Sequence, residues 1–161
     1  MNTINIQTNG NKKASNENVV AGGLSQVLAE SYVLYLKTHN FHWNVTGSMF
    51  QPLHSVFEGQ YTALAEAVDE IAERIRALGV PAPGSFSEFQ CLSSIDEASG
   101  KPRALEMVKE LLDGHETISQ TANKVAVIAQ EHGNEGTADL MIQRIQEHDK
   151  TPWMLRSFLD N

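Results

Sequence analysis

The chain has 161 residues, of which 41% are hydrophobic and 20% are charged, and its formal net charge is −8. That length and apolar content predict one globular domain with a buried core. A single cysteine, Cys91, excludes an intrachain disulfide framework and a thiolate metal cluster. The first residues lack the apolar stretch of a secretory signal, and the longest apolar runs are too short to span a bilayer. We therefore expect a cytoplasmic protein without a membrane segment.

Charge is distributed unevenly along the chain. Residues 1–16 contain Lys12 and Lys13 and no acid, whereas the remainder is acidic. We expect a flexible tail over 1–16 and one folded domain over 17–161. Because an acidic body repels the phosphates of DNA and two lysines offset this little, DNA binding should be weak or absent.

The first predicted helix runs from about Asn18 to Asn44, because apolar residues there repeat with the helical period. Gly22 and Gly23 weaken its first turns. One stripe along this helix holds Leu24, Leu28, Tyr32, Tyr35, His39 and His42. Residues 44–48 interrupt the pattern and predict a break.

The second helix should begin near Pro52 and end at Gly79, ahead of Pro81 and Pro83. Residues 80–102 form the long connection, and the spacing of Ser85 and Glu88 predicts a short capped helix inside it.

The third predicted helix spans about Arg103 to Glu131, and the fourth spans Glu135 to Leu159 with a kink at Pro152. Four long helices, with a long connection that carries a short helix between the second and the third, predict an all-α, ferritin-like four-helix bundle.

Candidate metal ligands cluster around the junction of the first two helices. They are His42, His54, Glu58, Asp69 and Glu73. The last four lie within about 100° of arc on one face of the second helix. Imidazoles and carboxylates without a thiolate suit iron, manganese or zinc. Any single pair at this spacing is usually an ordinary solvated surface, whereas five such residues together favour a metal site.

Distance limits how these ligands can combine. From His54 to Asp69 is a rise of roughly 22 Å along a helix, whereas a metal–ligand bond is about 2 Å long. Either the two halves serve separate sites, or a second chain completes each site across a twofold axis. No histidine follows a glutamate by three residues, which disfavours an intrachain di-iron centre.

Two segments resemble the Dps family of mini-ferritins: KTHNFHWNVTGSMFQPLHSVFEGQYTALAEAVDEIAERIRALG (37–79) and HDKTPWMLRSFL (148–159). The resemblance implies that His42 and His54 are ferroxidase ligands and that Asp69 and Glu73 come from the twofold mate. Glu58 falls where many members have aspartate. Trp43 matches a tryptophan beside the centre that can absorb oxidising equivalents.

The resemblance also implies a hollow dodecamer built on twofold dimers. Such a shell oxidises ferrous iron at intersubunit di-iron sites, with hydrogen peroxide or dioxygen as the oxidant, and stores ferric mineral. Whether zinc occupies part of the site is left open. Glu135 and Asp139 are candidates for an ion-entry pore, with helix capping and dipole complementarity as the alternative. The expected function is therefore that of an iron-storing ferroxidase which protects against oxidative damage.

Two other functions compete with this one: a nucleoid protein that condenses DNA and binds metal only secondarily, and a helical assembly module without enzymatic activity. The remaining histidines are expected to serve packing or surface roles, with His115 hydrogen-bonded in the core and His132 at a helix end. His39 could instead support a metal ligand. His148 and Trp153 are expected to pack, as is Trp43 apart from its position beside the centre.

Overall fold

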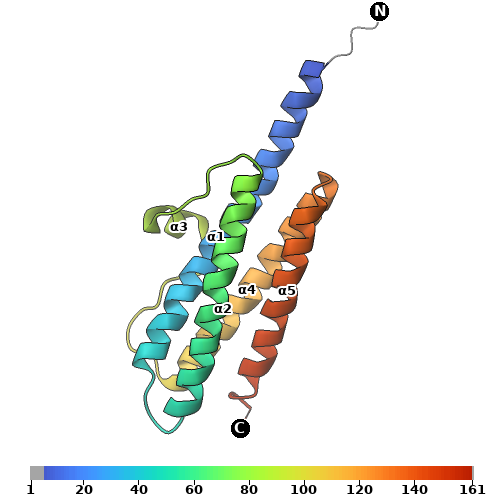
Figure 1. The fold of residues 1–161 in the computed structure, drawn as a ribbon. Coiled ribbons are helices and arrows are strands. Elements are labelled where there is room, and N and C mark those ends of the chain that lie inside the picture. The colour runs from blue at the N-terminus through green and yellow to red at the C-terminus, as the bar shows by residue number, and fades with distance from the viewer. Residues whose placement is uncertain (1–5, 161) are drawn as a thin grey trace, which may run out of the picture.

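The computed structural model describes the backbone of residues 6–160 and the side chains of residues 14–160. This part of the chain forms helices and no strands: α1 (Ile6–Asn44), α2 (Phe50–Ala77), α3 (Phe86–Leu92), α4 (Ala104–Glu131) and α5 (Glu135–Arg156). The four long helices form a bundle, and the short α3 lies outside it beside α1 (Figure 1). The predicted all-α, ferritin-like bundle is confirmed.

The bundle consists of two helix pairs, α1 with α2 and α4 with α5, and α1 also packs on α4. Short turns join the members of each pair, while residues 78–103 carry the chain from one pair to the other. Two helical glycines allow α1 and α4 to approach closely. A Cβ atom on Gly23 would stand 2.8 Å from Val125, and one on Gly114 would stand 2.5 Å from Leu34.

The predicted start of the first helix near Asn18 is wrong, because α1 begins at Ile6. The helix continues beyond the bundle, where the other long helices no longer accompany it (Figure 1). Lys12 and Lys13 lie outside the described side chains. The flexible tail over 1–16 and the domain over 17–161 stay predictions.

The other predicted boundaries agree closely with the structure. Helix α2 ends beside Gly79, whose φ of +83° suits glycine. The Ser85 capping box is present, since the backbone N–H of Glu88 donates to Ser85 Oγ and that of Ser85 donates to the Glu88 carboxylate. Helix α5 runs through Pro152 and ends at Arg156, three residues before the predicted Leu159.

The core lies between the four long helices, and α1 contributes much of it. Leu24 and Leu28 of its predicted stripe are fully buried. By length and composition alone, Ala14–Asn44 could cross a membrane, contrary to the expectation that every apolar run is too short. Half of its most apolar window is buried in the bundle, as is typical of a core helix.

Candidate metal centre

His42 and His54 form a reciprocal pair at the junction of α1 and α2. The Nδ1 atom of His42 lies 2.9 Å from the backbone oxygen of His54, and the Nδ1 atom of His54 lies 2.9 Å from that of His42. The two rings stack with centroids 3.8 Å apart and planes 19° apart. His42 is buried and His54 is half-buried.

These bonds determine the tautomer of both imidazoles. A carbonyl oxygen can only accept, so each Nδ1 must carry the hydrogen and donate it. In a neutral imidazole the Nε2 atom then holds the free lone pair, which is the form that binds a metal. The turn at 45–49 therefore brings together two imidazoles whose Nε2 atoms are available to a metal.

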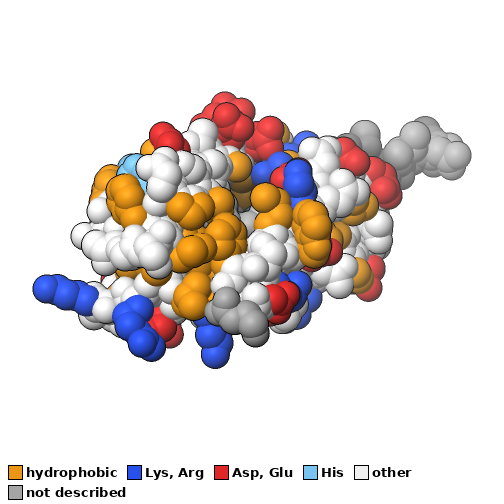
Figure 2. Space-filling model, turned by 90° about the horizontal axis from the view of Figure 1, so that it is seen from below, with side chains coloured by type: hydrophobic (Ala, Val, Ile, Leu, Met, Phe, Trp, Pro, Cys, Tyr) orange, Lys and Arg blue, Asp and Glu red, His pale blue; other side chains and the backbone are white. Residues whose placement is uncertain are grey.

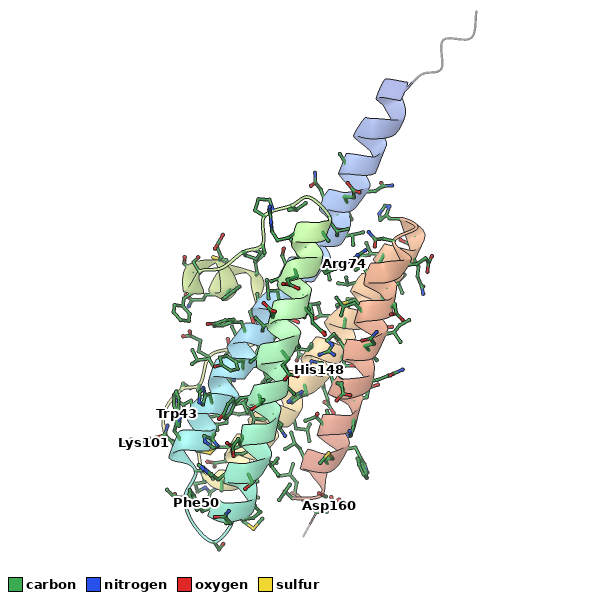
Figure 3. All side chains as sticks on the ribbon, viewed as in Figure 1. Trp43, Phe50, Arg74, Lys101, His148 and Asp160 are labelled. Atoms are coloured by element: carbon green, nitrogen blue, oxygen red, sulfur yellow. The ribbon has the colours of Figure 1, made fainter. Side chains whose placement is uncertain are left out.

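The predicted acidic ligands do not gather around this pair. Helix α2 is continuous from Phe50 to Ala77, so the distance argument from the sequence applies to the folded chain. Figure 3 shows Trp43 and Phe50 at one end of the bundle and Arg74 near the opposite end of α2. Within the described residues, no three His, Cys, Asp or Glu side chains converge on a possible metal position.

Glu58, Asp69 and Glu73 are exposed on α2. Glu58 follows His54 by one helical turn, whereas Asp69 and Glu73 lie toward the other end. The neighbouring Arg74 does not neutralise Glu73, because it donates to Thr137 Oγ1 at 2.9 Å and to Asn134 Oδ1 at 2.7 Å. The distal carboxylates are therefore available to a ligand or a second chain.

Aromatic rings surround the histidine pair. His39 stacks on Tyr61 with centroids 4.1 Å apart and contacts Trp43 at 4.0 Å. Burial, reinforced by the charge of His42, lowers the pKa of His39. This environment favours the packing role expected for His39. Trp43 packs against His39, as expected, although 59% of it is exposed in the single chain, and its proposed place beside a metal centre stays a prediction.

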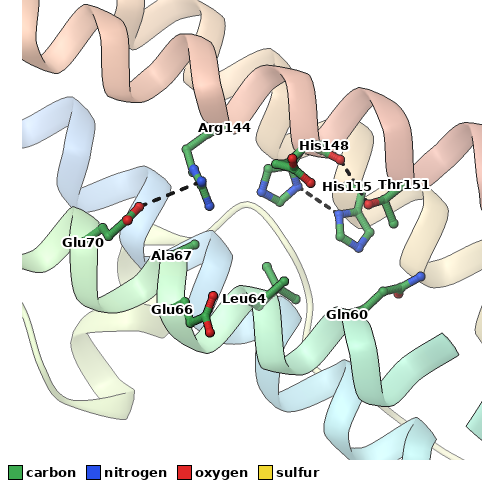
Figure 4. A pocket seen from close by; sticks show the side chains of 11 residues that line it. Gln60, Leu64, Glu66, Ala67, Glu70, His115, Arg144, His148 and Thr151 are labelled. Atoms are coloured by element: carbon green, nitrogen blue, oxygen red, sulfur yellow. Dashed lines mark hydrogen bonds and ion pairs between the residues drawn. The ribbon is translucent and has the colours of Figure 1, made fainter. Parts of the chain in front are cut away.

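A second histidine pair lies inside the bundle. His115 of α4 and His148 of α5 are both buried, with their Nδ1 atoms 2.9 Å apart. They line a pocket of about 300 Å³ between α2, α4 and α5 (Figure 4). Burial lowers the pKa of His148 to about 4 and that of His115 well below its usual value. The hydrogen-bonded core role predicted for His115 is confirmed, and His148 is its partner.

The candidate pore residues lie around the start of α5. Glu135 and Asp139 are exposed. Asn134 already caps this helix by accepting from the backbone of Thr137, so neither acid is needed as the cap. His132 is the C-cap residue of α4, as its predicted place at a helix end requires. Trp153 is 69% exposed, so the expectation that it packs is wrong within one chain.

Sequence reasoning missed three contacts: the Tyr61 ring beside His39 and His42, the pairing of His115 with His148, and the bridge from Arg74 to the start of α5. A signal existed for Tyr61, which follows His54 by seven residues and so shares its face of α2. No spacing rule connects the members of the other two contacts.

Comparison with known proteins gives the class first. Residues 22–161 match the family model described as a ferritin-like domain. The Dps protein of Vibrio cholerae O1, described as a member of a superfamily of ferritin-like diiron-carboxylate proteins, is 33% identical. Its crystal structure superposes with a TM-score of 0.88, covering 91% of this chain and 92% of that one. The chain therefore belongs to the ferritin-like family.

Closer relatives narrow the class. DNA protection during starvation protein 2 of Bacillus anthracis is 40% identical over 137 residues, which cover 85% of this chain and 94% of that protein. The crystal structure of Dps from Staphylococcus aureus is 37% identical with a TM-score of 0.86, covering 88% of this chain and 95% of that one. Within the ferritin-like family, this chain is one of the Dps proteins, and the resemblance seen in the sequence is confirmed.

Proposed function

We propose that this chain is a cytoplasmic, Dps-type ferroxidase and iron store that protects against oxidative damage. It oxidises ferrous iron with hydrogen peroxide at sites shared by two subunits, and it keeps the ferric product in a hollow dodecamer. The observation that carries this proposal is the ligand geometry of α2. Two imidazoles with free Nε2 atoms lie at one end, and Asp69 and Glu73 stand exposed toward the other.

A twofold axis between antiparallel α2 helices completes each site. It brings His42, His54 and Glu58 of one subunit opposite Asp69 and Glu73 of its mate, and it does so twice per dimer. The imidazoles and carboxylates together suit ferrous and ferric iron. Glu58, one turn from His54, would supply a further carboxylate to the same site.

Two ferrous ions at one site let hydrogen peroxide accept two electrons together. With two protons from solvent, this yields two ferric ions and two water molecules without releasing hydroxyl radical. The residues of the chain contribute orientation and charge. The Nδ1 bonds hold both imidazoles in the metal-binding tautomer, and the carboxylates offset the positive charge of the bound iron. Trp43 is proposed to be oxidised in place of other groups when an oxidising species escapes this two-electron reaction.

Iron reaches the interior, in this proposal, through a pore lined by Glu135 and Asp139. Their exposure at the start of α5, where Asn134 serves as the cap, supports a role other than capping. Carboxylates around a narrow opening raise the local concentration of cations.

Mixing two inactive variants tests the shared site. His54→Ala and Asp69→Ala should each abolish ferrous oxidation above the buffer blank, because each removes a ligand from every site. A mixed dimer of the two regains one intact site, so unfolding and reassembling the variants together should restore part of the activity. Reassembled single variants are the control, and a mixture no more active than these would contradict sharing. Anaerobic titration with Fe(II) in competition with Zn(II) shows which ion the centre holds.

A further inference from the structure

All three tyrosines of the chain join one cluster of rings that ends at the candidate metal centre. Tyr61 of α2 meets His42 edge-to-face, with ring centroids 5.2 Å apart. Tyr35 of α1 lies 6.3 Å from Tyr61, and Tyr32 lies 5.7 Å from Tyr35. Each tyrosine is half-buried. We call Tyr61, Tyr35 and Tyr32 the tyrosine ladder.

The ladder continues away from the metal centre toward α3. Tyr32 stacks on Phe89 of α3 at 4.7 Å and meets Phe86 at 6.2 Å. Phenylalanine is far harder to oxidise than tyrosine, so the oxidisable part of the cluster ends at Tyr32. On the other side, His39 separates Trp43 from Tyr61, because its ring contacts both. Trp43 and the tyrosine ladder therefore both adjoin the His39 ring, on separate sides of it.

Packing alone would require rings but not phenols. Phenylalanine at these positions would keep the edge-to-face and stacked contacts. Instead, every tyrosine in the chain belongs to this one series of rings, and the first of them, Tyr61, contacts the proposed iron ligand His42. Compared with the phenyl ring, the phenol adds an O–H that can hydrogen-bond and can also give up an electron and a proton together.

We propose that the tyrosine ladder supplies the second electron when only one ferrous ion is bound at the centre, an inference that rests on the proposed ferroxidase function. Fe(II) gives one electron to hydrogen peroxide, and the Tyr61 phenol gives the other through His42. The phenolic proton and one proton from solvent complete two water molecules. The products are Fe(III), two waters and a tyrosyl radical, and no hydroxyl radical leaves the site.

Tyr35 and Tyr32 serve as further electron donors behind Tyr61. A tyrosyl radical at Tyr61 takes an electron and a proton from Tyr35, which restores the first phenol and moves the radical outward. The same exchange between Tyr35 and Tyr32 places it against α3. The ladder thus moves the oxidising equivalent away from the iron ligands, whose imidazoles would otherwise be exposed to it.

The test uses the assembled protein loaded anaerobically with one ferrous ion per centre and then mixed with one equivalent of hydrogen peroxide. Rapid-freeze electron paramagnetic resonance measures tyrosyl radical, and a spin trap measures hydroxyl radical. Tyr61→Phe keeps the ring and removes the phenol. It should reduce the tyrosyl signal several-fold and raise the trapped hydroxyl radical several-fold. Trp153→Phe removes an oxidisable ring outside the cluster and should match the wild type in both signals.

Equal tyrosyl and hydroxyl signals in wild type and Tyr61→Phe would overturn the ladder. A wild-type protein that oxidises no ferrous iron above the buffer blank, even with two ions per centre, would overturn the proposed function and the ladder with it. Peptide mapping of wild type after repeated single-iron cycles is an independent measurement that needs no variant. Oxidation products should concentrate on Tyr61, Tyr35 and Tyr32, and products confined to other residues would contradict the proposal.

Discussion

Histidine serves different purposes in this chain according to what its ring nitrogens contact. His42 and His54 donate through Nδ1 to each other's backbone and leave Nε2 free. His115 and His148 instead place their Nδ1 atoms against each other inside the bundle. The first pair is therefore suited to binding metal, and the second joins two helices. One residue type thus supports two functions because its hydrogen-bonding environment selects the available nitrogen.

The first prediction concerns the tautomers of His42 and His54. In the metal-free protein at neutral pH, both imidazoles should carry hydrogen on Nδ1, because each faces a carbonyl oxygen that can only accept. Long-range ¹⁵N–¹H correlation spectra of ¹⁵N-histidine-labelled protein distinguish the tautomers directly. Signals of His42 and His54 are assigned by their loss in His42→Gln and His54→Gln. An Nε2–H tautomer at either residue would contradict the geometry.

Among the helices, the contacts of α5 with its neighbours depend on polar side chains as well as on apolar packing. The His115–His148 pair joins α5 to α4. Arg74 reaches from α2 to Asn134 and Thr137 at the start of α5, and Arg144 of α5 pairs with Glu70 of α2 at 3.9 Å (Figure 4). The pocket of about 300 Å³ lies between these helices. The attachment of α5 should therefore respond to pH and to changes in single polar residues.

The buried histidine pair should make the fold sensitive to acid. The folded state holds the pKa of His148 near 4, so the unfolded chain binds a proton first as the pH falls below about 6.5. Stability is fully present above that pH and is lost on the way toward 4. Between pH 7 and pH 5 the loss from His148 should be on the order of 2 kcal/mol. Denaturant unfolding at the two pH values measures it.

Replacing both partners by apolar residues is the matched variant for this effect. The double variant His115→Leu/His148→Leu removes the titrating groups without leaving one unpaired imidazole in the core. Its stability should differ less between pH 7 and pH 5 than that of the wild type. His132→Gln, which changes a histidine at a helix end, should keep the wild-type response. Equal pH responses in the double variant and the wild type would rule out the pair as the source.

The Arg74 bridge gives a prediction for the α2–α5 contact. Arg74→Ala removes the hydrogen bonds to buried Thr137 and half-buried Asn134, and it should lower the free energy of unfolding by about 1–2 kcal/mol. Amide hydrogen exchange should speed up around residues 134–137, where the bridge ends. Arg76→Ala is the control, because Arg76 is exposed two residues away on the same helix. Equal acceleration of exchange in both variants would show that the Arg74 bridge does not specifically stabilise the start of α5.

At the scale of the whole molecule, the single chain exposes both candidate acidic ligands and apolar surface. Asp69 and Glu73 are exposed, and so are large hydrophobic side chains where α1 meets α2 (Trp43 and Phe50) and on α5 (Ile142, Trp153 and Met154). Figure 2 shows hydrophobic side chains gathered over one end of the bundle. Exposed apolar surface of this kind marks interfaces with other proteins. The proposed dodecamer would cover such surface and complete the metal centres at the same time.

The negative net charge of the chain predicts weak or absent DNA binding. Each chain carries a formal charge of −8, so an assembly repels the phosphate backbone as a whole. Gel-shift experiments at physiological salt should show little or no complex, and any complex at low salt should disappear as salt is added. Deleting residues 1–16 should abolish such binding and leave ferrous oxidation unchanged. Tight, salt-resistant binding would favour the alternative of a DNA-condensing protein.

The sequence by itself determined the helices and the candidate ligands. Apolar spacing, the Ser85 capping box and Gly79 act within a few residues of themselves, so they predicted the boundaries of most helices. The candidate ligands His42, His54, Asp69 and Glu73 followed from spacing along a helix and from the resemblance to Dps. The start of α1 was missed because its first turns lack an apolar stripe.

Only the tertiary structure decided which side chains from different helices meet. The His115–His148 pair spans 33 residues and the Arg74 bridge spans about 60, and no local period relates such positions. The tautomers of His42 and His54 depend on backbone carbonyls that become neighbours only when the 45–49 turn closes. Contacts within one helix follow from its period, whereas contacts between helices depend on how the whole bundle packs.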